Sequence, residues 1–525
     1  MIESTDITKS AKTGDNAVVT TSPVEATSSL EATEIARVGD NVLVTTSPVE
    51  ATFQQLPFAT VAEKVKPLKN KGPPPIEFGE ADSVTDWDKH VSKFRYLQAT
   101  AYRRIFCFIM SVNTAALIGL MVVEKGRPSV LSYNTATSAN IAACILSRQE
   151  NVVNLLYEIC CCVPHSWPLQ IRKRLARIYH YGGIHSGCGM AASMWFLLQS
   201  ILVTLEYIKN WRSTLWLLNL ISSWFIVLML VIIRYSAFPA FRRQFHNHFE
   251  AMHRYAGWSG LIVFWIHLFL VILLEQEKDK RNGFQHEDFG LLLIKIPSFW
   301  LLLVSTSCGL VSWGRLRRRE VFAETLGEGS IGHAIRLHFK YYDMPPFYGV
   351  KVSTDPLREW HSFATIPDKR GGFSILVSNA GDWTNEIVNN PPKSLWVRGR
   401  PLHGLAYTSR IFKQIVVVAT GSGIGPMLSL FASHVVPARV LWSTPNPLKT
   451  FGQDIIDDVY AADKNAVVWN TREHGRPDLV RLTMGLVKEC EAEAVYVISN
   501  KPVTSMLVVE LQARGVNVVG VIWDS

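Results

Sequence analysis

Residues 415–428 read IVVVATGSGIGPML. The opening run of β-branched apolar residues is typical of a strand buried on both faces of a parallel sheet. Three glycines follow, Gly421, Gly423 and Gly425, and Pro426 suits the first turn of a helix. Such a turn lets the backbone approach a pyrophosphate at a helix N-terminus, where free amides and the helix dipole favour anions. The stretch therefore predicts a dinucleotide-binding strand–turn–helix unit.

The sequence around this unit predicts two soluble domains. Upstream, residues 334–342 (AIRLHFKYY) and 373–379 (FSILVSN) show the alternation expected of strands, and strand and helix patterns alternate after residue 411. A small β-barrel followed by a parallel-sheet domain is the order found in ferredoxin-reductase-like modules. We place the barrel at 316–410 and the α/β dinucleotide-binding domain at 411–525.

Farther upstream the composition changes to that of a membrane protein. Hydrophobic residues make up 48% of the chain, but they concentrate in its middle part. Most of the apolar stretches there approach the ~20 residues that a spanning helix needs. We therefore expect a six-span α-helical bundle within 86–315. The six stretches are 105–123, 138–163, 184–205, 214–233, 253–274 and 291–313.

Basic residues at the ends of these stretches predict the orientation. Lys and Arg gather before the first stretch and after the second, fourth and sixth, whereas the alternate loops carry fewer. By the positive-inside rule both termini face the cytoplasm. The net charge of +9 follows largely from this topology, so we expect no nucleic-acid partner. The first residues lack a signal-peptide pattern, and we expect the first apolar helix to direct the chain to a membrane.

The second apolar stretch is interrupted by Arg148, Gln149, Glu150 and Glu158. Charged groups are expensive in lipid, so such residues usually face a cavity or a partner. One interpretation places Arg148 near a cofactor or substrate in the outer half of the membrane. The other is that the helix starts later and Arg148 is interfacial.

Histidines in the third and fifth stretches suggest a haem site. The fifth reads MHRYAGWSGLIVFWIHL, so His253 and His267 share a helix face and lie roughly 21 Å apart along its axis. The third supplies His185 at the level of His253, but Gln199 stands where a partner for His267 is wanted. We predict one haem b between His185 and His253. For His267, ligation of a second haem and a direct hydrogen bond to Gln199 both stay open.

The barrel region carries three short motifs: WHSFAT at 360–365, GDWT at 381–384, and VRGRP at 397–401 followed by Gly404. Together with the glycine-rich turn, they make the chain from the third stretch onward resemble the ferric reductase/NADPH oxidase superfamily, and within it the fungal TmpA-type transmembrane flavoproteins. Ala364 departs from the Ser or Thr that this family has after Phe. The resemblance implies FAD held by His361, Ser362, Phe363, Thr365, Gly381, Asp382, Trp383, Thr384, Gly399 and Gly404.

The same resemblance implies a site for the nicotinamide nucleotide. Residues 439–443 (RVLWS) and 475–477 (GRP) correspond to the segments that receive its ribose and phosphate, which implicates Trp442. Arg472 or Arg476 could fork onto a 2′-phosphate, which favours NADPH, with NADH as the alternative. Two further residues have implied catalytic roles: Ser499, in the SNKP that replaces the family's Cys-Gly-Pro, and Trp523, as an aromatic ring over the flavin or a core residue.

The N-terminal segment differs from the rest. Residues 15–27 (DNAVVTTSPVEAT) and 40–52 (DNVLVTTSPVEAT) form a duplication with a period of 25 in a Thr- and Ser-rich stretch, and a Pro-rich stretch follows at 66–75. Two copies are too few for a solenoid. We predict a disordered tail over 1–85.

These features together predict a multi-pass membrane oxidoreductase that passes electrons from NADPH through FAD to a membrane haem. Its acceptor could be ferric iron, oxygen or a small molecule, and the family suggests the plasma membrane. An alternative is a haem-free flavin- and dinucleotide-binding membrane protein in developmental or secondary-metabolite signalling. The oligomeric state stays open.

Overall fold

The computed structural model describes residues 82–210, 213–282, 288–327, 333–369 and 371–521, with the backbone of 37–38 and 41–42. The chain divides into two units, 1–71 and 72–525. The described part of the first is an antiparallel pair, β1 (Arg37–Val38) and β2 (Asn41–Val42). The rest of the predicted tail, up to residue 81, lies outside the described residues.

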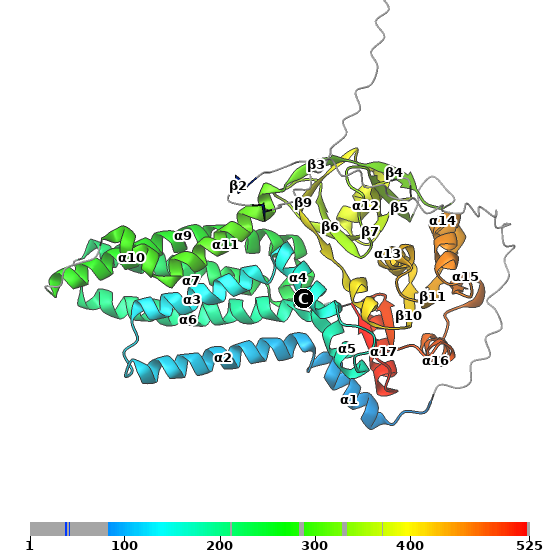
Figure 1. Ribbon diagram of the computed structural model, residues 1–525, viewed down its shortest axis with the longest axis horizontal. Helices are drawn as coiled ribbons and strands as arrows, with labels where there is room; N and C mark the ends of the chain where they lie inside the picture. The colour runs from blue at the N-terminus through cyan, green and yellow to red at the C-terminus, as the bar shows by residue number, and fades with distance from the viewer. Residues whose placement is uncertain are drawn as a thin grey trace, which may run out of the picture. The chain divides into compact units, whose positions relative to one another are not determined.

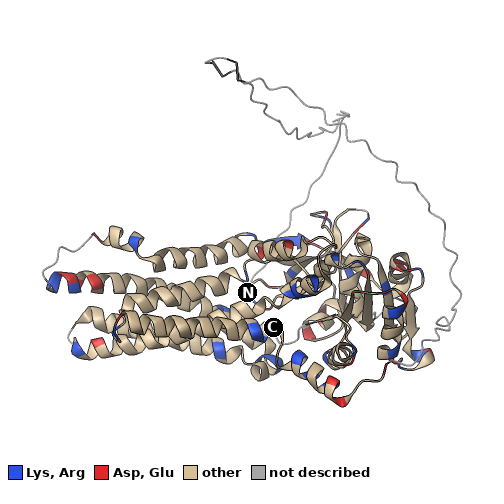
Figure 2. Ribbon diagram, turned by 60° about the horizontal axis from the view of Figure 1, so that its bottom comes forward, with Lys and Arg blue, Asp and Glu red and all other residues tan. Residues whose placement is uncertain are grey.

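The second unit begins with a bundle of long helices (Figure 1). Among the described residues, four helices are long and apolar enough to cross a membrane, namely α2, α6, α7 and α9. Helices α10 and α11 together pass the same test, but they are bent by 74°. Charged residues gather toward the helix ends (Figure 2). The helices are α2 (Ala101–Val123), α3 (Val130–Leu146), α6 (Gly182–Lys209), α7 (Thr214–Ser236), α8 (Pro239–Gln244), α9 (His246–Arg281), α10 (Phe289–Lys295) and α11 (Pro297–Gly314).

Two glycines bring α2 and α6 close together. A Cβ atom on Gly183 would meet the backbone oxygen of Tyr102, and one on Gly187 would lie 3.1 Å from Cβ of Ile109. Small residues four apart allow the close backbone approach that packs helices in lipid, where hydrophobic burial gives no driving force. The glycines of α6 therefore fix how α2 lies against it.

The predicted second span is wrong as a single helix. Helix α3 ends at Leu146, and α4 (Glu150–Cys161) starts after a break, with the Gln149 side chain accepting a hydrogen bond from the amide of Val152. The Glu150 carboxylate accepts a hydrogen bond from Ser312 Oγ at 2.6 Å and also contacts Gly399. The polar residues thus end one helix and cap the next, so Glu150 lies at the end of α11 rather than in the middle of a span.

Helices α4, α5 (Leu169–Leu175) and η1 (Ala176–His180) pack into the soluble half of the chain. Val153 and Tyr157 of α4 belong to the same buried cluster as the first strand of the parallel sheet. Arg172 of α5 forms two bonds of 2.6 and 2.8 Å with the Glu493 carboxylate and donates to the Ile411 carbonyl. Helix α1 (Asp86–Leu97) also docks there, through Ser92 Oγ donating to the Val509 carbonyl.

A curled seven-stranded antiparallel sheet follows the bundle (Figure 1). The strand order is β3-β9-β6-β7-β8-β5-β4, and the helix α12 (Asp382–Asn389) lies after β8. Phe373, Ile375 and Val377 of β8 fill its core with Val352 and Leu395. The strands are β3 (Arg317–Glu320), β4 (Phe322–Thr325), β5 (Ala334–Phe339), β6 (Tyr348–Ser353), β7 (His361–Pro367), β8 (Phe373–Ser378) and β9 (Ser394–His403).

The last part is a five-stranded parallel sheet in the order β12-β11-β10-β13-β14. In chain order this is 3-2-1-4-5, which places a topological switch point between β10 and β13. The predicted strand–turn–helix is present as β10, η3 and α13. The elements are η2 (Leu405–Ile411), β10 (Ile415–Thr420), η3 (Gly421–Ile424), α13 (Gly425–Ser433), β11 (Ala438–Thr444), α14 (Pro447–Ala462), β12 (Val467–Asn470), α15 (Thr471–His474), α16 (Leu479–Glu489), β13 (Ala494–Ile498), α17 (Lys501–Ala513) and β14 (Val518–Gly520).

Candidate functional site

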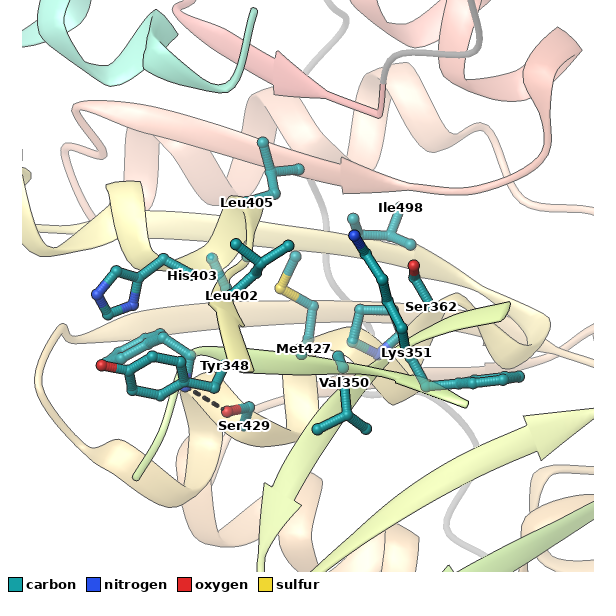
Figure 3. Close-up of a pocket in the computed structure, with 17 residues that line it drawn as sticks. Tyr348, Val350, Lys351, Ser362, Leu402, His403, Leu405, Met427, Ser429 and Ile498 are labelled. Atoms are coloured by element: carbon teal, nitrogen blue, oxygen red, sulfur yellow. Dashed lines mark hydrogen bonds between the residues drawn. The ribbon is translucent and has the colours of Figure 1, made fainter. Parts of the chain in front are cut away.

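A cavity of about 220 Å³ lies where the curled sheet meets the parallel sheet. Its walls come from β6, β7, the end of β9, the start of α13 and the end of β13. Figure 3 shows Lys351 and Ser362 on the same side of the cavity as Ile498, with His403 and Tyr348 toward the other side. Ligand sites commonly combine an apolar wall with a few polar groups in this way.

Lys351 is a charged side chain among the apolar residues of the cavity wall. Burial lowers its pKa, and the nearby Arg398 acts in the same direction. Arg398 itself lies over the rings of Trp313 and Trp360, at 4.7 and 4.6 Å from their centroids. The cavity therefore offers an ammonium group that an anionic or electron-rich ligand would stabilise.

Only part of the WHSFAT motif lines the cavity. Ser362, Phe363 and Ala364 line the cavity. Thr365 does not: its fully buried hydroxyl donates to the Tyr348 carbonyl at 2.9 Å, which joins β7 to β6. The hydroxyl one place after the expected position is thus buried in a bond within the sheet and does not line the cavity. This placement corrects the prediction of Thr365 as a cofactor contact.

The GDWT motif lies outside the cavity wall and begins a helix. The Thr384 hydroxyl accepts a hydrogen bond from the Gly381 amide at 2.9 Å and so caps α12, while Asp382 is exposed. The ring of Trp383 stacks on His361, with 4.1 Å between centroids. His361, the first residue of β7, also lies outside the cavity wall, so the stacked pair of His361 and Trp383 does not form the cavity.

Two glycines of the third motif have different surroundings. Gly399 has a φ of +73°, and a Cβ atom there would collide with the Glu150 carboxylate. The missing side chain therefore lets the start of α4 pack against β9. Gly404 lines the cavity, and its amide donates to the Phe347 carbonyl at 2.8 Å. Of the two predicted flavin contacts, only Gly404 reaches the cavity.

The glycine-rich turn lies at the switch point of the parallel sheet. Gly421 has a φ of +52°, and a Cβ atom on Gly423 would collide with the Ile498 carbonyl of the neighbouring strand. A Cβ atom on Gly425 would lie 2.8 Å from the Leu376 side chain of the curled sheet, and Pro426 lines the cavity. The turn thus contacts the end of β13 and the curled sheet as well as opening α13.

Trp442 supports this turn from within the core. Its indole Nε1 donates to the Gly421 carbonyl at 2.9 Å, and the side chain is fully buried. A fully buried ring has no surface left for a nucleotide, so the predicted direct contact is corrected to a positioning role. Beside the turn, Ser499 Oγ lies 2.5 Å from Thr420 Oγ1, which places Ser499 at the switch point.

The remaining predicted nucleotide residues lie farther along the edge of the sheet. Arg472 and Arg476 are exposed in the segment that follows β12. The Arg472 amide donates to Asn470 Oδ1 at 3.1 Å, which fixes the start of that segment. Because both side chains are exposed, their guanidinium groups can bind an anion from solvent. Trp523 lies outside the described residues.

In the bundle, His185 of α6 and His253 of α9 face each other with ring centroids 6.2 Å apart and planes at 39°. Nδ1 of His185 lies 3.0 Å from the Cys144 carbonyl, to which it can only donate. This bond leaves the other ring nitrogen of His185 with a lone pair for a metal. Arg148, at the break before α4, lies over the Tyr181 ring at 5.5 Å, on the side of the soluble half. This position agrees with the interpretation that Arg148 is interfacial, and its side of the membrane stays a prediction.

His267 lies in a closed hydrogen-bonded pocket. Its Nε2 is 2.8 Å from the Gln199 amide nitrogen and its Nδ1 is 3.0 Å from Ser222 Oγ. Ser222 donates to the Asn219 carbonyl, so its oxygen accepts from Nδ1–H and Nε2 accepts from Gln199. Both ring nitrogens of this fully buried histidine are occupied. Of the two possibilities that the sequence left open for His267, the structure shows the direct bond to Gln199. Neither ring nitrogen is then left with a free lone pair for a metal.

Several residues of the site carry no local signal in the sequence. Lys351 and His403 line the cavity, and the Asn154 side chain of α4 bonds to the backbone of Pro401 and His403. A lysine in a strand and an asparagine in a helix are ordinary surface residues by pattern. Only the tertiary packing of α4 on β9 brings them to the site.

A family model, "Adenylate-forming reductase 03009, C-terminal domain", matches residues 405–525. Adenylate-forming reductase 03009 of Coprinopsis cinerea is 40% identical over 436 residues, which is 83% of this chain and 41% of the relative. Adenylate-forming reductase 06235 of the same organism is 39% identical over 438 residues, with the same coverage of 83% and 41%. The chain thus spans about two fifths of the length of these relatives. The matches support similarity to reductases, whereas the finer likeness to ferric reductases and NADPH oxidases stays a prediction.

Solved structures resemble the chain weakly. A flavohemoglobin from Malassezia yamatoensis with bound FAD and heme has a TM-score of 0.36 at 12% identity, covering 75% of this chain and 98% of that one. A mutant ferredoxin-NADP+ reductase from Plasmodium falciparum, in complex with 2'P-AMP, has a TM-score of 0.31 at 10% identity, covering 40% and 96%. Scores of this size do not establish a shared fold.

Proposed function

We propose that the chain is a membrane-bound oxidoreductase that takes electrons from NADPH, passes them through FAD in the cavity, and delivers them to a haem b between His185 and His253. The observation that carries the proposal is the position of the cavity. One wall comes from the curled sheet, and the other from Pro426 and Met427 at the start of α13, directly after the glycine-rich turn, and from Ile498 at the switch point of the parallel sheet. In doubly wound sheets a ligand binds outside the carboxyl ends of the strands at such a point.

In this proposal the two sheets hold different cofactors. The residues of the curled sheet, Ser362, Phe363 and Gly404, would hold the flavin ring in the cavity beside Lys351. Bound flavin accepts hydride and returns electrons singly, so it joins two-electron and one-electron chemistry. The chain's own contribution is to orient the ring, to exclude water and to place the Lys351 ammonium group near it.

The nucleotide would lie along the carboxyl edge of the parallel sheet. Amides of the turn at Gly421 and Gly423 would bind its pyrophosphate at the start of α13. Ser499, bonded to Thr420 at the switch point, would lie beside the nicotinamide. Arg472 and Arg476 would bind the 2′-phosphate that distinguishes NADPH from NADH.

The histidine pair satisfies a simple geometric test for haem. Metal–imidazole bonds of about 2.0–2.1 Å put the ring centres of two opposed ligands roughly 6 Å apart, close to the observed separation. Helix α6 packs mainly on α3 and helix α9 packs mainly on α7, rather than on each other, which leaves His185 and His253 opposed across the bundle. Arg148 lies close enough to influence both histidines and would suit an anionic haem substituent. With His267 bonded to Gln199, the proposal holds one haem.

The membrane arrangement is part of the proposal. Helix α3 and the bent pair α10 and α11 would complete six crossings with α2, α6, α7 and α9, and both termini would face the cytoplasm of a plasma-membrane protein. The domains would be a tail over 1–85, the bundle over 86–315, the FAD-binding barrel over 316–410 and the nucleotide domain over 411–525. The packing of α4 and α5 on the soluble half supports the proposal that these helices hold it at the membrane surface. The final acceptor is ferric iron, oxygen or a small molecule.

A spectrum of the purified protein tests the proposal. Dithionite-reduced minus oxidised spectra of the full chain should show a b-type haem band together with flavin bleaching. His185→Ala should abolish the haem band and keep the flavin. His248→Ala, an exposed histidine on the same helix as His253, serves as the matched control and should keep both. Flavin-loaded protein without a haem band would contradict the membrane electron path.

The relatives favour a second candidate function. Their names describe reductases that form adenylates, and the match covers most of this chain. In that case the nucleotide domain would deliver hydride from NADPH to an activated carboxyl group supplied by another protein or domain. Consumption of NADPH with an acyl adenylate, unaffected by His185→Ala, would favour this candidate over the haem path.

A further inference from the structure

His403, the last residue of β9, lies in the cavity wall between two aromatic rings. Its ring centroid is 4.3 Å from that of Tyr348 and 3.8 Å from that of Tyr407. The residue is 7% exposed. The two tyrosines cover both faces of the imidazole, so only its edges are open to polar partners.

The two ring nitrogens of His403 have different surroundings. Nε2 lies 3.4 Å from Oε1 of Glu158, whose side chain is 53% exposed on the outer side of α4. Nδ1 is buried and has no hydrogen-bond partner among the residues that the structure describes. A buried polar atom without a partner is costly, and it is usual only where a ligand, a water molecule or a proton occupies the position. One ring thus joins a solvent-exposed carboxylate to a buried position in the cavity wall.

The position of His403 is fixed by the helix that carries Glu158. Oδ1 of Asn154, one turn before Glu158, accepts a hydrogen bond from the His403 amide at 2.9 Å. The Asn154 amide nitrogen donates to the Pro401 carbonyl, also at 2.9 Å. Helix α4 therefore holds the strand end on which the imidazole sits, and the Glu158–His403 distance does not depend on a mobile surface loop.

The charges around His403 favour a neutral imidazole. Burial lowers the pKa of His403, Glu158 of α4 opposes this effect, and Arg410 after η2 adds to it. The other titratable neighbours are the phenols of Tyr157, Tyr348 and Tyr407. A neutral imidazole accepts a proton at one nitrogen and releases one from the other, which is the behaviour required of a proton carrier.

We propose that His403 and Glu158 form a proton path between the cavity and solvent. This inference rests on the proposed function, in which the cavity holds the flavin. Oxidation of NADPH to NADP⁺ supplies two electrons and one proton. When the electrons leave one at a time for a haem or another one-electron acceptor, the proton cannot follow them and must reach water. His403 would accept it at Nδ1 and pass one from Nε2 to the Glu158 carboxylate, which exchanges it with solvent.

Rapid mixing of the reduced full-length protein with ferricyanide tests the path without NADPH. Two ferricyanide ions take two electrons from the flavin and a third oxidises the reduced haem. Flavin absorbance reports the oxidation of the flavin, and a pH-indicator dye reports the released proton. In the unaltered protein, proton release should keep pace with oxidation. Glu158→Gln should slow the release by about tenfold or more. Formate should restore it, and Glu158→Asp should retain it.

Two further variants complete the test. Glu386→Gln removes an exposed carboxylate of α12 and should leave proton release unchanged. His403→Gln should slow release as Glu158→Gln does, with rescue by imidazole. Unchanged proton release in flavin-loaded Glu158→Gln would overturn the path and leave the proposed function intact. Absence of flavin from the unaltered protein would overturn both.

Discussion

The side-chain amide of Gln199 lies 2.8 Å from Nε2 of His267, and together with Ser222 it occupies the imidazole completely. We therefore expect one haem per flavin, measured by a pyridine haemochrome assay against released FAD. Gln199→Leu should keep this ratio but destabilise the bundle by about 1–3 kcal/mol, because a buried ring nitrogen loses its partner. Thermal unfolding in detergent measures the loss, and two haems per flavin would contradict our assignment of His267.

The glycine-rich turn gives a second prediction. Gly423→Ala should abolish reduction of the flavin by NADPH, because the added methyl group collides with the Ile498 carbonyl and displaces the turn. Reduction by dithionite should be unaffected. Gly309→Ala in α11 is the matched control: its added Cβ atom meets nothing within 4 Å, and it should retain NADPH-dependent reduction. Equal activity of the two variants would show that the turn does not bind the nucleotide.

Exposed arginines after β12 should set the preference for NADPH. A hydrogen bond to a charged group is worth about 1.5–3 kcal/mol, and about 1.4 kcal/mol corresponds to a tenfold change in binding. Arg472→Ala or Arg476→Ala should therefore raise KM for NADPH about tenfold or more and leave KM for NADH unchanged. Steady-state rates with both nucleotides measure this. A parallel rise for both would assign the arginines to another part of the nucleotide.

The ion pair between Arg172 and Glu493 should stabilise the docking of α5 on the soluble half. Their side chains are only 4% and 15% exposed, and the Arg172 guanidinium, hydrogen-bonded to the carboxylate, holds the pKa of Glu493 below 4.5. Arg172→Ala should cost about 3 kcal/mol near pH 7, because it leaves a buried carboxylate without its cation.

The pH dependence of this pair has a definite sign. A lowered carboxyl pKa contributes stability that is fully present above the unfolded value of 4.5 and is lost as pH falls through the folded value. The difference in thermal stability between the unaltered protein and Arg172→Ala should therefore shrink only in acid, below about pH 4.5. A difference that disappears on raising the pH would contradict the ion-pair explanation.

Local sequence patterns predicted the helices and strands whose formation depends mainly on residues close to them in the sequence. The apolar run and glycines of 415–428 predicted β10, η3 and α13, and most apolar stretches predicted helices of the bundle. The family resemblance, by contrast, misplaced Trp442 and Thr365, because a short motif gives the chemistry of a side chain without saying whether it faces the core. Both proved to be buried on the core side.

Contacts between distant segments could not be predicted from pattern. The hydrophobicity of α4 made 138–163 look like one membrane span, whereas its apolar face is buried in the soluble core. His403 is an isolated histidine in the sequence, and its significance comes from Glu158, which lies 245 positions earlier. Gln199 was the exception: its position on the helix relative to His185 was sufficient to suggest a hydrogen bond to His267.

The burial of α4 and α5 in the soluble core has a consequence for biosynthesis. Val153, Tyr157 and Arg172 leave the ribosome before most of the bundle and long before the strands that they contact. Since domains fold progressively as they are synthesised, these helices must wait for partners that are synthesised more than two hundred residues later. The core around the parallel sheet thus includes α4, so an exchange of the region after residue 315 without this helix would leave part of that core uncovered.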